Sequence, residues 1–150
     1  GEGEGHAVAF LHNQLMGVEP VPVVPVFLNT YYPPNQPTPR RCYALGQAIR
    51  QAVESMLGNA RVGIAASGGL SHFTVDEELD RSVLAALAAK DASTLHNLPL
   101  NKLEAGSSEI RNWICIGGAL EGLGLQWHDY IPGYRSPAGT GTGIAFAAWS

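Results

Sequence analysis

The chain has 150 residues, of which 45% are hydrophobic and 15% charged, and its formal net charge at pH 7 is -4. This composition is typical of a globular domain. The small negative charge, without a block of like charges, excludes nucleic acid and an anionic membrane surface as expected partners. The longest apolar runs are too short or too interrupted to span a bilayer, so no membrane segment is expected.

Cys42 and Cys115 are the only cysteines. Two distant cysteines without a signal peptide favour a reducing, cytoplasmic environment over a disulfide scaffold. The first five residues, Gly-Glu-Gly-Glu-Gly, resemble neither a basic targeting region nor a capping motif. We expect them to be an entry point into a longer chain, or a flexible end.

The first third of the chain predicts a short helix, a strand and a loop. Residues 7–16 form a mixed apolar stretch that indicates the helix. In residues 21–28, valines favour a buried strand, but Pro22 and Pro25 place it at a sheet edge or make it irregular. Residues 31–39 are rich in proline and predict a long loop.

Residues 41–57 predict an amphipathic helix, because Leu45, Ile49 and Met56 recur at helical spacing. Thr38 is suited to cap its N-terminus, with Pro39 at the first helical position, where the missing N–H costs nothing. Gly58 is expected to end this helix.

The remainder of the chain continues to alternate strands with helices. Expected elements are a buried strand at 61–67, a helix at 76–90, a short helix or loop at 91–103, a helix at 108–121, and strands at 126–131 and 143–149 around a Gly/Pro-rich loop at 133–142. The alternation predicts an α/β fold, with a mixed sheet flanked by helices, in one domain covering residues 1–150.

The run Ser67-Gly68-Gly69-Leu70-Ser71-His72 directly follows the predicted buried strand. Open α/β sheets place their active sites just beyond strand ends, and glycines let the backbone approach a ligand. A histidine held there can act as an acid or base near neutral pH. The structural alternative is a turn in which His72 satisfies a loop carbonyl.

Glu109 follows Ser107 and Ser108, either of which can cap a helix. Acidic residues are favoured in a first helical turn, so Glu109 alone is better explained as a helix-start residue. It becomes a candidate ligand only alongside His72. The spacing of His6 and His12 matches no zinc signature, and we interpret His12, His96 and His128 as structural.

The sequence lacks the motifs of several other classes of protein. The sequence contains no P-loop, no G-x-G-x-x-G and no G-x-S-x-G elbow. The glycine-rich run at 139–143 precedes a strand rather than a helix, which makes a phosphate cradle a weak interpretation.

At this point the sequence resembles the class III extradiol ring-cleavage dioxygenases, the group typified by the protocatechuate 4,5-dioxygenase β subunit and gallate dioxygenase. The strand-end run ending in His72 is similar to a motif of that family, and four further segments agree in order. They are Gly5-His6-Ala7, the Val/Pro-rich stretch with Pro33-Pro34 and Pro39-Arg40-Arg41, the run 106–113 around Glu109, and the Gly-rich run 139–143 before residues 145–149.

The resemblance implies extradiol cleavage of a catechol-type ring by non-haem Fe(II) and O2. Glu109 would be the carboxylate of a 2-His-1-carboxylate metal site, which leaves positions open for an aromatic diol and O2. His72 would be the acid/base, and His6 a second active-site histidine. A protocatechuate-like diol is the implied substrate class, with a 2-aminophenol as a close variant.

The resemblance also implies that the chain is the C-terminal half of the catalytic subunit. In the family both histidine ligands precede the segment that matches His6, and nothing here corresponds to that part. We therefore expect pairing with the missing N-terminal half, or an oligomer. Gly5 replaces the usual Asp, and the segment from His72 to Asp80 is shorter than in protocatechuate-type enzymes.

Two other hypotheses remain. The chain could be a non-catalytic partner subunit of the same fold without iron, although such a subunit needs neither His72 nor Glu109. It could also be an unrelated α/β binding module, which would leave the five ordered motifs as coincidence.

Overall fold

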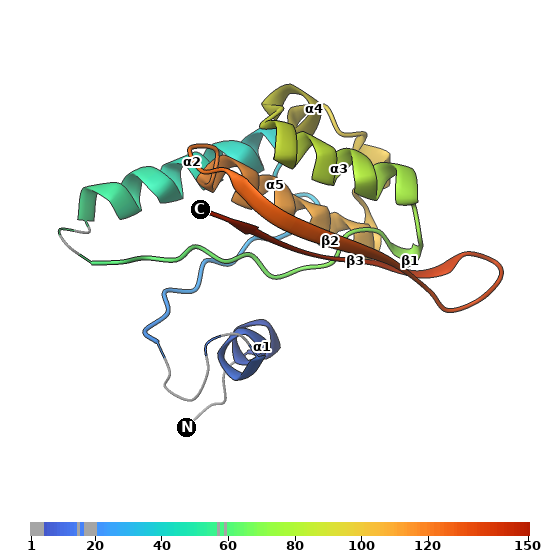
Figure 1. The fold of residues 1–150 in the computed structure, drawn as a ribbon. Coiled ribbons are helices and arrows are strands. Elements are labelled where there is room, and N and C mark those ends of the chain that lie inside the picture. Colours follow the sequence, from blue (N-terminus) through green and yellow to red (C-terminus); the bar gives the residue numbers. More distant parts are fainter. Residues whose placement is uncertain (1–4, 15, 17–20, 57, 59) are drawn as a thin grey trace.

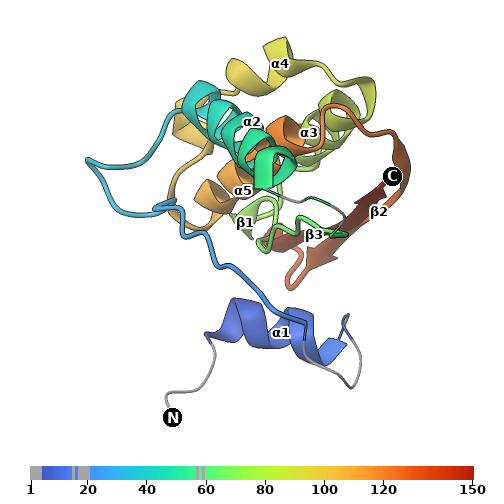
Figure 2. The same ribbon diagram turned by 90° about the vertical axis from the view of Figure 1, so that its left-hand side faces the viewer.

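A computed structural model describes residues 5–14, 16, 21–56, 58 and 60–150 of the chain. A layer of helices covers one face of a small β-sheet (Figure 1). Helix α1 (His6–Gln14) lies apart from that layer, on the far side of the sheet (Figures 1 and 2). No helix in the described part of the chain is both long and apolar enough to cross a membrane.

Helix α2 (Pro39–Met56) confirms the predicted amphipathic helix and its start. The backbone N–H of Arg41 donates to Oγ1 of Thr38 at 3.3 Å, and Pro39 occupies the first helical position. Helix α2 packs on α5 (Ile110–Ala119), where glycines allow a close approach. A Cβ atom at Gly46 would collide with the carbonyl of Cys115, and one at Gly118 with the carbonyl of Tyr43.

Helix α3 (Glu77–Ala89) confirms the helix predicted at 76–90, and short helix α4 (Ala92–His96) follows it. Asp76 and Asp91 cap the two helices by accepting hydrogen bonds from the backbone of Leu79 and Thr94. Single-turn helices η1 (Leu100–Lys102) and η2 (Ala105–Glu109) lead into α5. The buried core between these elements contains Val83, Leu87, Leu95, Leu103, Ile110 and Ile114.

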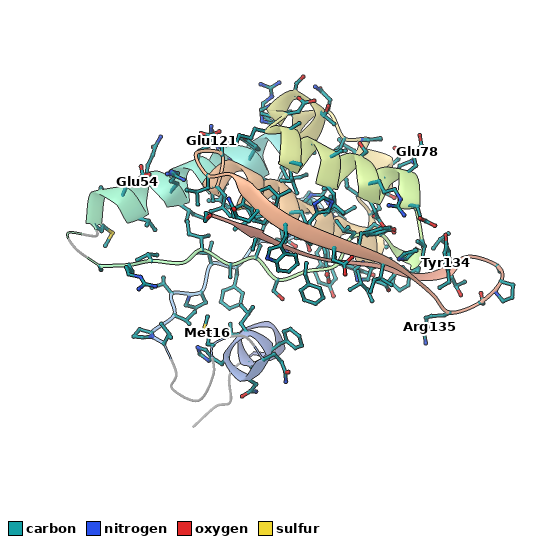
Figure 3. The ribbon with its side chains drawn as sticks, viewed as in Figure 1. Met16, Glu54, Glu78, Glu121, Tyr134 and Arg135 are labelled. Carbon is teal, nitrogen blue, oxygen red and sulfur yellow. The ribbon has the colours of Figure 1, made fainter. Side chains whose placement is uncertain are left out.

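The sheet has three antiparallel strands in the order β1-β3-β2. They are β1 (His72–Thr74), β2 (Leu125–Tyr134) and β3 (Thr140–Trp149), so both C-terminal strands are confirmed and extended. The β2–β3 hairpin reaches beyond the helix layer, and Tyr134 and Arg135 mark its end (Figures 1 and 3). The fold contains both helices and strands, as predicted. The described strands are all antiparallel, however, whereas a sheet with both parallel and antiparallel strands was predicted.

The two strands predicted at 21–28 and 61–67 are wrong for this structure, because neither segment has strand structure. A strand needs a neighbour to take up its backbone N–H and C=O groups, and no such pairing is present among the described residues. Pro22 and Pro25 further remove two donors. The side chains remain in solvent, since Val24 is 89% and Phe27 88% exposed.

The sheet presents apolar side chains on both faces. Tyr130, Ala145, Ala147 and Trp149 pack against the helix core. The register places a second set of large apolar side chains on the opposite face, where they are exposed: Trp127, Ile131, Ile144 and Phe146. Antiparallel sheets with one solvated face normally alternate apolar with polar residues, so this sheet is built to be covered on both sides.

Candidate active site

The segment from Gly68 to His72 is held firmly, although the described residues before it contain no strand. The backbone N–H of Leu70 donates to the carbonyl of Gly143 at 3.0 Å, and the N–H of Gly143 donates to the carbonyl of Ser71 at 2.8 Å. Leu70 and Ser71 are buried. These bonds attach the segment to β3, and β1 then begins at His72.

The hydrogen bonds of His72 fix both its position and its tautomer. Its backbone N–H donates to Oγ of Ser107 at 2.9 Å. Its Nδ1 lies 2.8 Å from the carbonyl oxygen of Leu70. A carbonyl only accepts, so Nδ1 carries the hydrogen and Nε2 of the neutral ring keeps a free lone pair. The imidazole can therefore take a proton at Nε2.

Glu109 ends η2 and lies directly before α5. Its Oε2 accepts a hydrogen bond from the backbone N–H of Gly69 at 2.8 Å and lies 3.8 Å from Nε2 of His72. The side chain of Glu109 is 42% exposed and that of His72 is 23% exposed. The structure thus brings together the two principal candidate residues and leaves both accessible.

The predicted serine caps of the last long helix are wrong. Helix α5 has no side-chain cap hydrogen bond, because the chain enters it through the tight turn η2. Ser107 instead accepts a hydrogen bond from the backbone of His72. Ser107 is thus a site-positioning residue that the capping pattern did not reveal.

The side chain of His72 has room because two neighbouring residues, Gly69 and Gly106, are glycines. A Cβ atom at Gly69 would lie 2.5 Å from Cε1 of His72, and one at Gly106 would lie 2.5 Å from its Cβ. Gly68 has φ of 153°, a region that favours glycine. Phe73, directly after the histidine, has φ of 67°, which is strained for a residue with a side chain.

The first turn of α5 holds the glycine segment from the other side. Nδ2 of Asn112 donates to the carbonyl of Ser67 at 2.9 Å, and Nε1 of Trp113 donates to the carbonyl of Gly68 at 3.0 Å. Both residues lie in the family-like run 106–113, but no hydrogen bond to the glycine segment was predicted for either. Their contacts join the start of α5 to the glycine segment.

The other histidines are placed in different ways. His6 begins α1, but its side chain lies outside the described residues, so its catalytic role stays a prediction. His96 packs edge-on against the ring of Tyr43, with centroids 4.9 Å apart, which supports a structural role. His128 lies exposed on β2.

The donor set for a metal ion is only partly present. Glu109 offers a carboxylate, a ligand type suited to divalent cations. Within the described ranges, no three His, Cys, Asp or Glu side chains come together as metal ligands. A metal bound by Glu109 therefore needs further ligands from outside these residues.

The comparisons with known proteins agree with one another. The family described as the catalytic LigB subunit of aromatic ring-opening dioxygenase matches residues 10–145. Gallate dioxygenase of Pseudomonas putida is 49% identical over 126 residues, covering 75% of this chain and 36% of that protein. The 2,3-dihydroxyphenylpropionate/2,3-dihydroxicinnamic acid 1,2-dioxygenase 2 of Pseudomonas putida is 36% identical over 121 residues, covering 78% of this chain and 37% of that protein.

A shorter match covers the 2,3-dihydroxyphenylpropionate/2,3-dihydroxicinnamic acid 1,2-dioxygenase of Paraburkholderia phymatum, 46% identical over 56 residues, with 37% of this chain and 17% of that protein. The chain thus spans little more than a third of the length of the curated relatives that match most of it. The family match covers most of the chain. The chain therefore belongs to the family of aromatic ring-opening dioxygenases described by the catalytic LigB subunit.

Proposed function

We propose that this chain is the C-terminal part of an Fe(II)-dependent extradiol dioxygenase that cleaves a catechol-type ring with O2. Glu109 supplies one carboxylate ligand, and His72 acts as acid/base. The observation that supports these roles is the 3.8 Å approach of Nε2 of His72 to Oε2 of Glu109. In this proposal the whole chain is a single domain with the class III extradiol fold.

Glu109 would hold the iron together with two histidines from polypeptide outside the described residues. Such a 2-His-1-carboxylate site would supply open coordination positions for the diol and O2 and would make electron transfer between them possible. The N–H of Gly69 holds the Glu109 carboxylate by its bond to Oε2. Gly69 thus fixes the orientation of this candidate ligand.

His72 would take a proton from a diol hydroxyl at Nε2 and return it later in the reaction. Its Nδ1 hydrogen bond to the Leu70 carbonyl keeps the lone pair on Nε2. Because Gly69 and Gly106 have no side chains, the imidazole fits beside the carboxylate of Glu109.

The remaining polypeptide of the longer protein would complete the sheet as well as the metal site. The exposed segments 21–28 and 61–67 and the apolar outer face of the sheet require a partner surface. We propose that the missing N-terminal half supplies it, with oligomerisation as a further source of contacts. We also propose a cytoplasmic location, which the free thiols of Cys42 and Cys115 support.

The substrate class is an aromatic vicinal diol. The relatives are named for gallate and for 2,3-dihydroxyphenylpropionate or 2,3-dihydroxicinnamic acid, and each of these compounds has hydroxyls on adjacent ring carbons. The test uses the complete protein that contains this chain, prepared without metal and then loaded with Fe(II). Gallate, protocatechuate, 2,3-dihydroxyphenylpropionate and 2-aminophenol are offered in turn, and O2 uptake and ring-opened product are measured.

We expect iron-dependent O2 uptake with one of these compounds and cleavage of the ring bond beside the hydroxyl-bearing carbons. His72→Ala should largely abolish cleavage, with a loss of about 10²-fold or more in kcat. A complete protein that binds no iron and opens none of these rings would instead favour a non-catalytic partner subunit of the same fold.

A further inference from the structure

Asp80 is a fully buried carboxylate in the first turns of α3, with 0% exposure. A buried charge is costly unless it is well hydrogen-bonded. Within the described residues Asp80 has no cationic partner. It accepts three hydrogen bonds: from the N–H of Ser71 at 2.8 Å, from Oγ of Ser71 at 2.7 Å, and from the hydroxyl of Tyr130 at 2.8 Å.

Hydrogen bonds hold both the backbone and the side chain of Ser71. Its Oγ donates to Asp80 and also accepts a hydrogen bond from the backbone N–H of Asp76 at 2.9 Å. Its carbonyl accepts from Gly143 on β3. Gly143 itself must lack a side chain, because a Cβ atom there would collide with the Asp80 carboxylate. Ser71 is thereby tied to both α3 and β3.

Ser71 lies between the two groups that aim the imidazole. Leu70, on one side, provides the carbonyl that accepts from Nδ1 of His72. His72, on the other side, carries the ring. A movement of Ser71 would therefore change two distances: the one from Nδ1 of His72 to the carbonyl of Leu70, and the one from Nε2 to Glu109.

We propose that Asp80 is a positioning residue for the acid/base His72, acting through Ser71, with Tyr130 as its support. This inference rests on the proposed function and deepens it.

A second carboxylate of α3 provides a matched control. Oε1 of Glu77 accepts a hydrogen bond from the hydroxyl of Tyr134 on β2 at 2.8 Å, as Asp80 does from Tyr130. Among the described residues, Glu77 makes no hydrogen bond or ion pair with Ser71, and its hydrogen bonds with Tyr134 and Arg81 are exposed. Glu77→Gln therefore disturbs a similar helix-to-strand bond without changing any hydrogen bond of Ser71 or Asp80.

The test compares Asp80→Asn, Tyr130→Phe and Glu77→Gln in the complete, iron-loaded protein, each with and without His72→Ala. In Asp80→Asn an amide nitrogen, which only donates, meets the hydroxyls of Ser71 and Tyr130. We expect kcat to fall roughly tenfold or more, as small misplacements of a catalytic group do, with KM and iron content nearly unchanged. Tyr130→Phe should have a smaller effect and Glu77→Gln none.

The double variant decides whether Asp80 acts through His72. With His72→Ala present, Asp80→Asn should cause no further loss of kcat, because the group that it positions is gone. An equal loss in both backgrounds, or an unchanged kcat in Asp80→Asn, would overturn the inference. If Asp80→Asn does not fold, Tyr130→Phe takes its place with the same two criteria.

A readout without turnover separates this inference from the proposed function. Nitrogen NMR of labelled histidine in the complete protein should show the Nδ1–H tautomer of His72 in the wild type and a mixture in Asp80→Asn. An unchanged ring signal contradicts the positioning role whether or not the protein cleaves a ring. Absence of ring cleavage in the wild type contradicts only the proposed function.

Discussion

Nε2 of His72 lies 3.8 Å from Oε2 of Glu109, and one short loop sets that distance. Glu109 accepts from the N–H of Gly69, and His72 donates from Nδ1 to the carbonyl of the next residue, Leu70. The backbone groups of two adjacent residues, Gly69 and Leu70, therefore hold two side chains that come from distant parts of the chain. This arrangement makes the pair sensitive to any change in the glycine segment.

Gly69→Ala tests that sensitivity. Its Cβ would lie 2.5 Å from Cε1 of His72, so the imidazole must move away from Glu109. We expect kcat of the complete enzyme to fall at least about tenfold. Gly124→Ala is the control, because a Cβ there makes only ordinary contacts, 3.5 Å from Nε2 of Gln126, and it should leave kcat unchanged. Equal activity of the two variants would show that the close approach is unimportant.

Arg111 is a buried cation that stabilises the path of the chain before the site. It is 4% exposed and donates to the carbonyls of Leu103 at 2.6 Å and Pro37 at 2.8 Å. Arg111→Met leaves the Leu103 carbonyl without this donor and the Pro37 carbonyl with only the thiol of Cys42, so we expect a loss of about 3 kcal/mol in the free energy of unfolding. Urea unfolding measures it.

The control for this variant is Arg135→Met at the exposed end of the hairpin (Figure 3). Its free energy of unfolding should change by less than about 0.5 kcal/mol. Similar urea midpoints for the two variants would contradict the role of Arg111.

Alkaline pH should destabilise the helix layer. Burial raises the pKa of the Cys42 thiol from 9.0 to about 11. Burial, aided by the hydrogen bond to Glu121, raises the pKa of Tyr43 to about 12. Both groups thus stay neutral in the folded protein after the unfolded chain has begun to lose their protons.

The sign of the effect follows from proton linkage. Above pH 9 the unfolded state binds fewer protons than the folded state, so the free energy of unfolding falls as pH rises from 9 toward 11. Urea midpoints at pH 8, 9, 10 and 10.5 measure the fall, and Cys42→Ala should reduce it. A midpoint that stays constant or rises over this range would contradict the prediction.

Local patterns predicted the helices well, for identifiable reasons. The apolar spacing in α2, the Thr38 cap and Pro39 act within a few residues of one another. The segments 21–28 and 61–67 failed because a strand depends on a neighbour, and a neighbour outside the described chain leaves no trace in local pattern. Their valines still indicate a need for burial.

The site was only partly visible in the sequence. Spacing alone favoured a helix-start role for Glu109, and only the family resemblance associated it with His72. Asp80 was missed because an aspartate early in a helix is ordinarily explained by the helix dipole. Its burial and its bonds to Ser71 come from the packing of α3 against the sheet.

The isolated 150-residue chain should bind Fe(II) weakly and turn over no substrate, because Glu109 is one ligand of a larger set. The apolar outer face of the sheet, with Trp127 and Phe146 exposed, should also make it associate with itself. Calorimetry with Fe(II) and light scattering measure the two properties. Tight, stoichiometric iron binding by a monomeric chain would contradict both expectations.

The most direct measurement compares iron content and ring cleavage in Glu109→Ala and His72→Ala of the complete protein. Glu104→Ala, which removes an exposed carboxylate nearby, is the control and should retain both. We predict that Glu109→Ala loses iron and activity together. His72→Ala should keep its iron and lose about 10²-fold or more in kcat, the usual contribution of a general acid/base. Normal iron content and normal ring cleavage in both variants would contradict the assignment of this pair as ligand and acid/base.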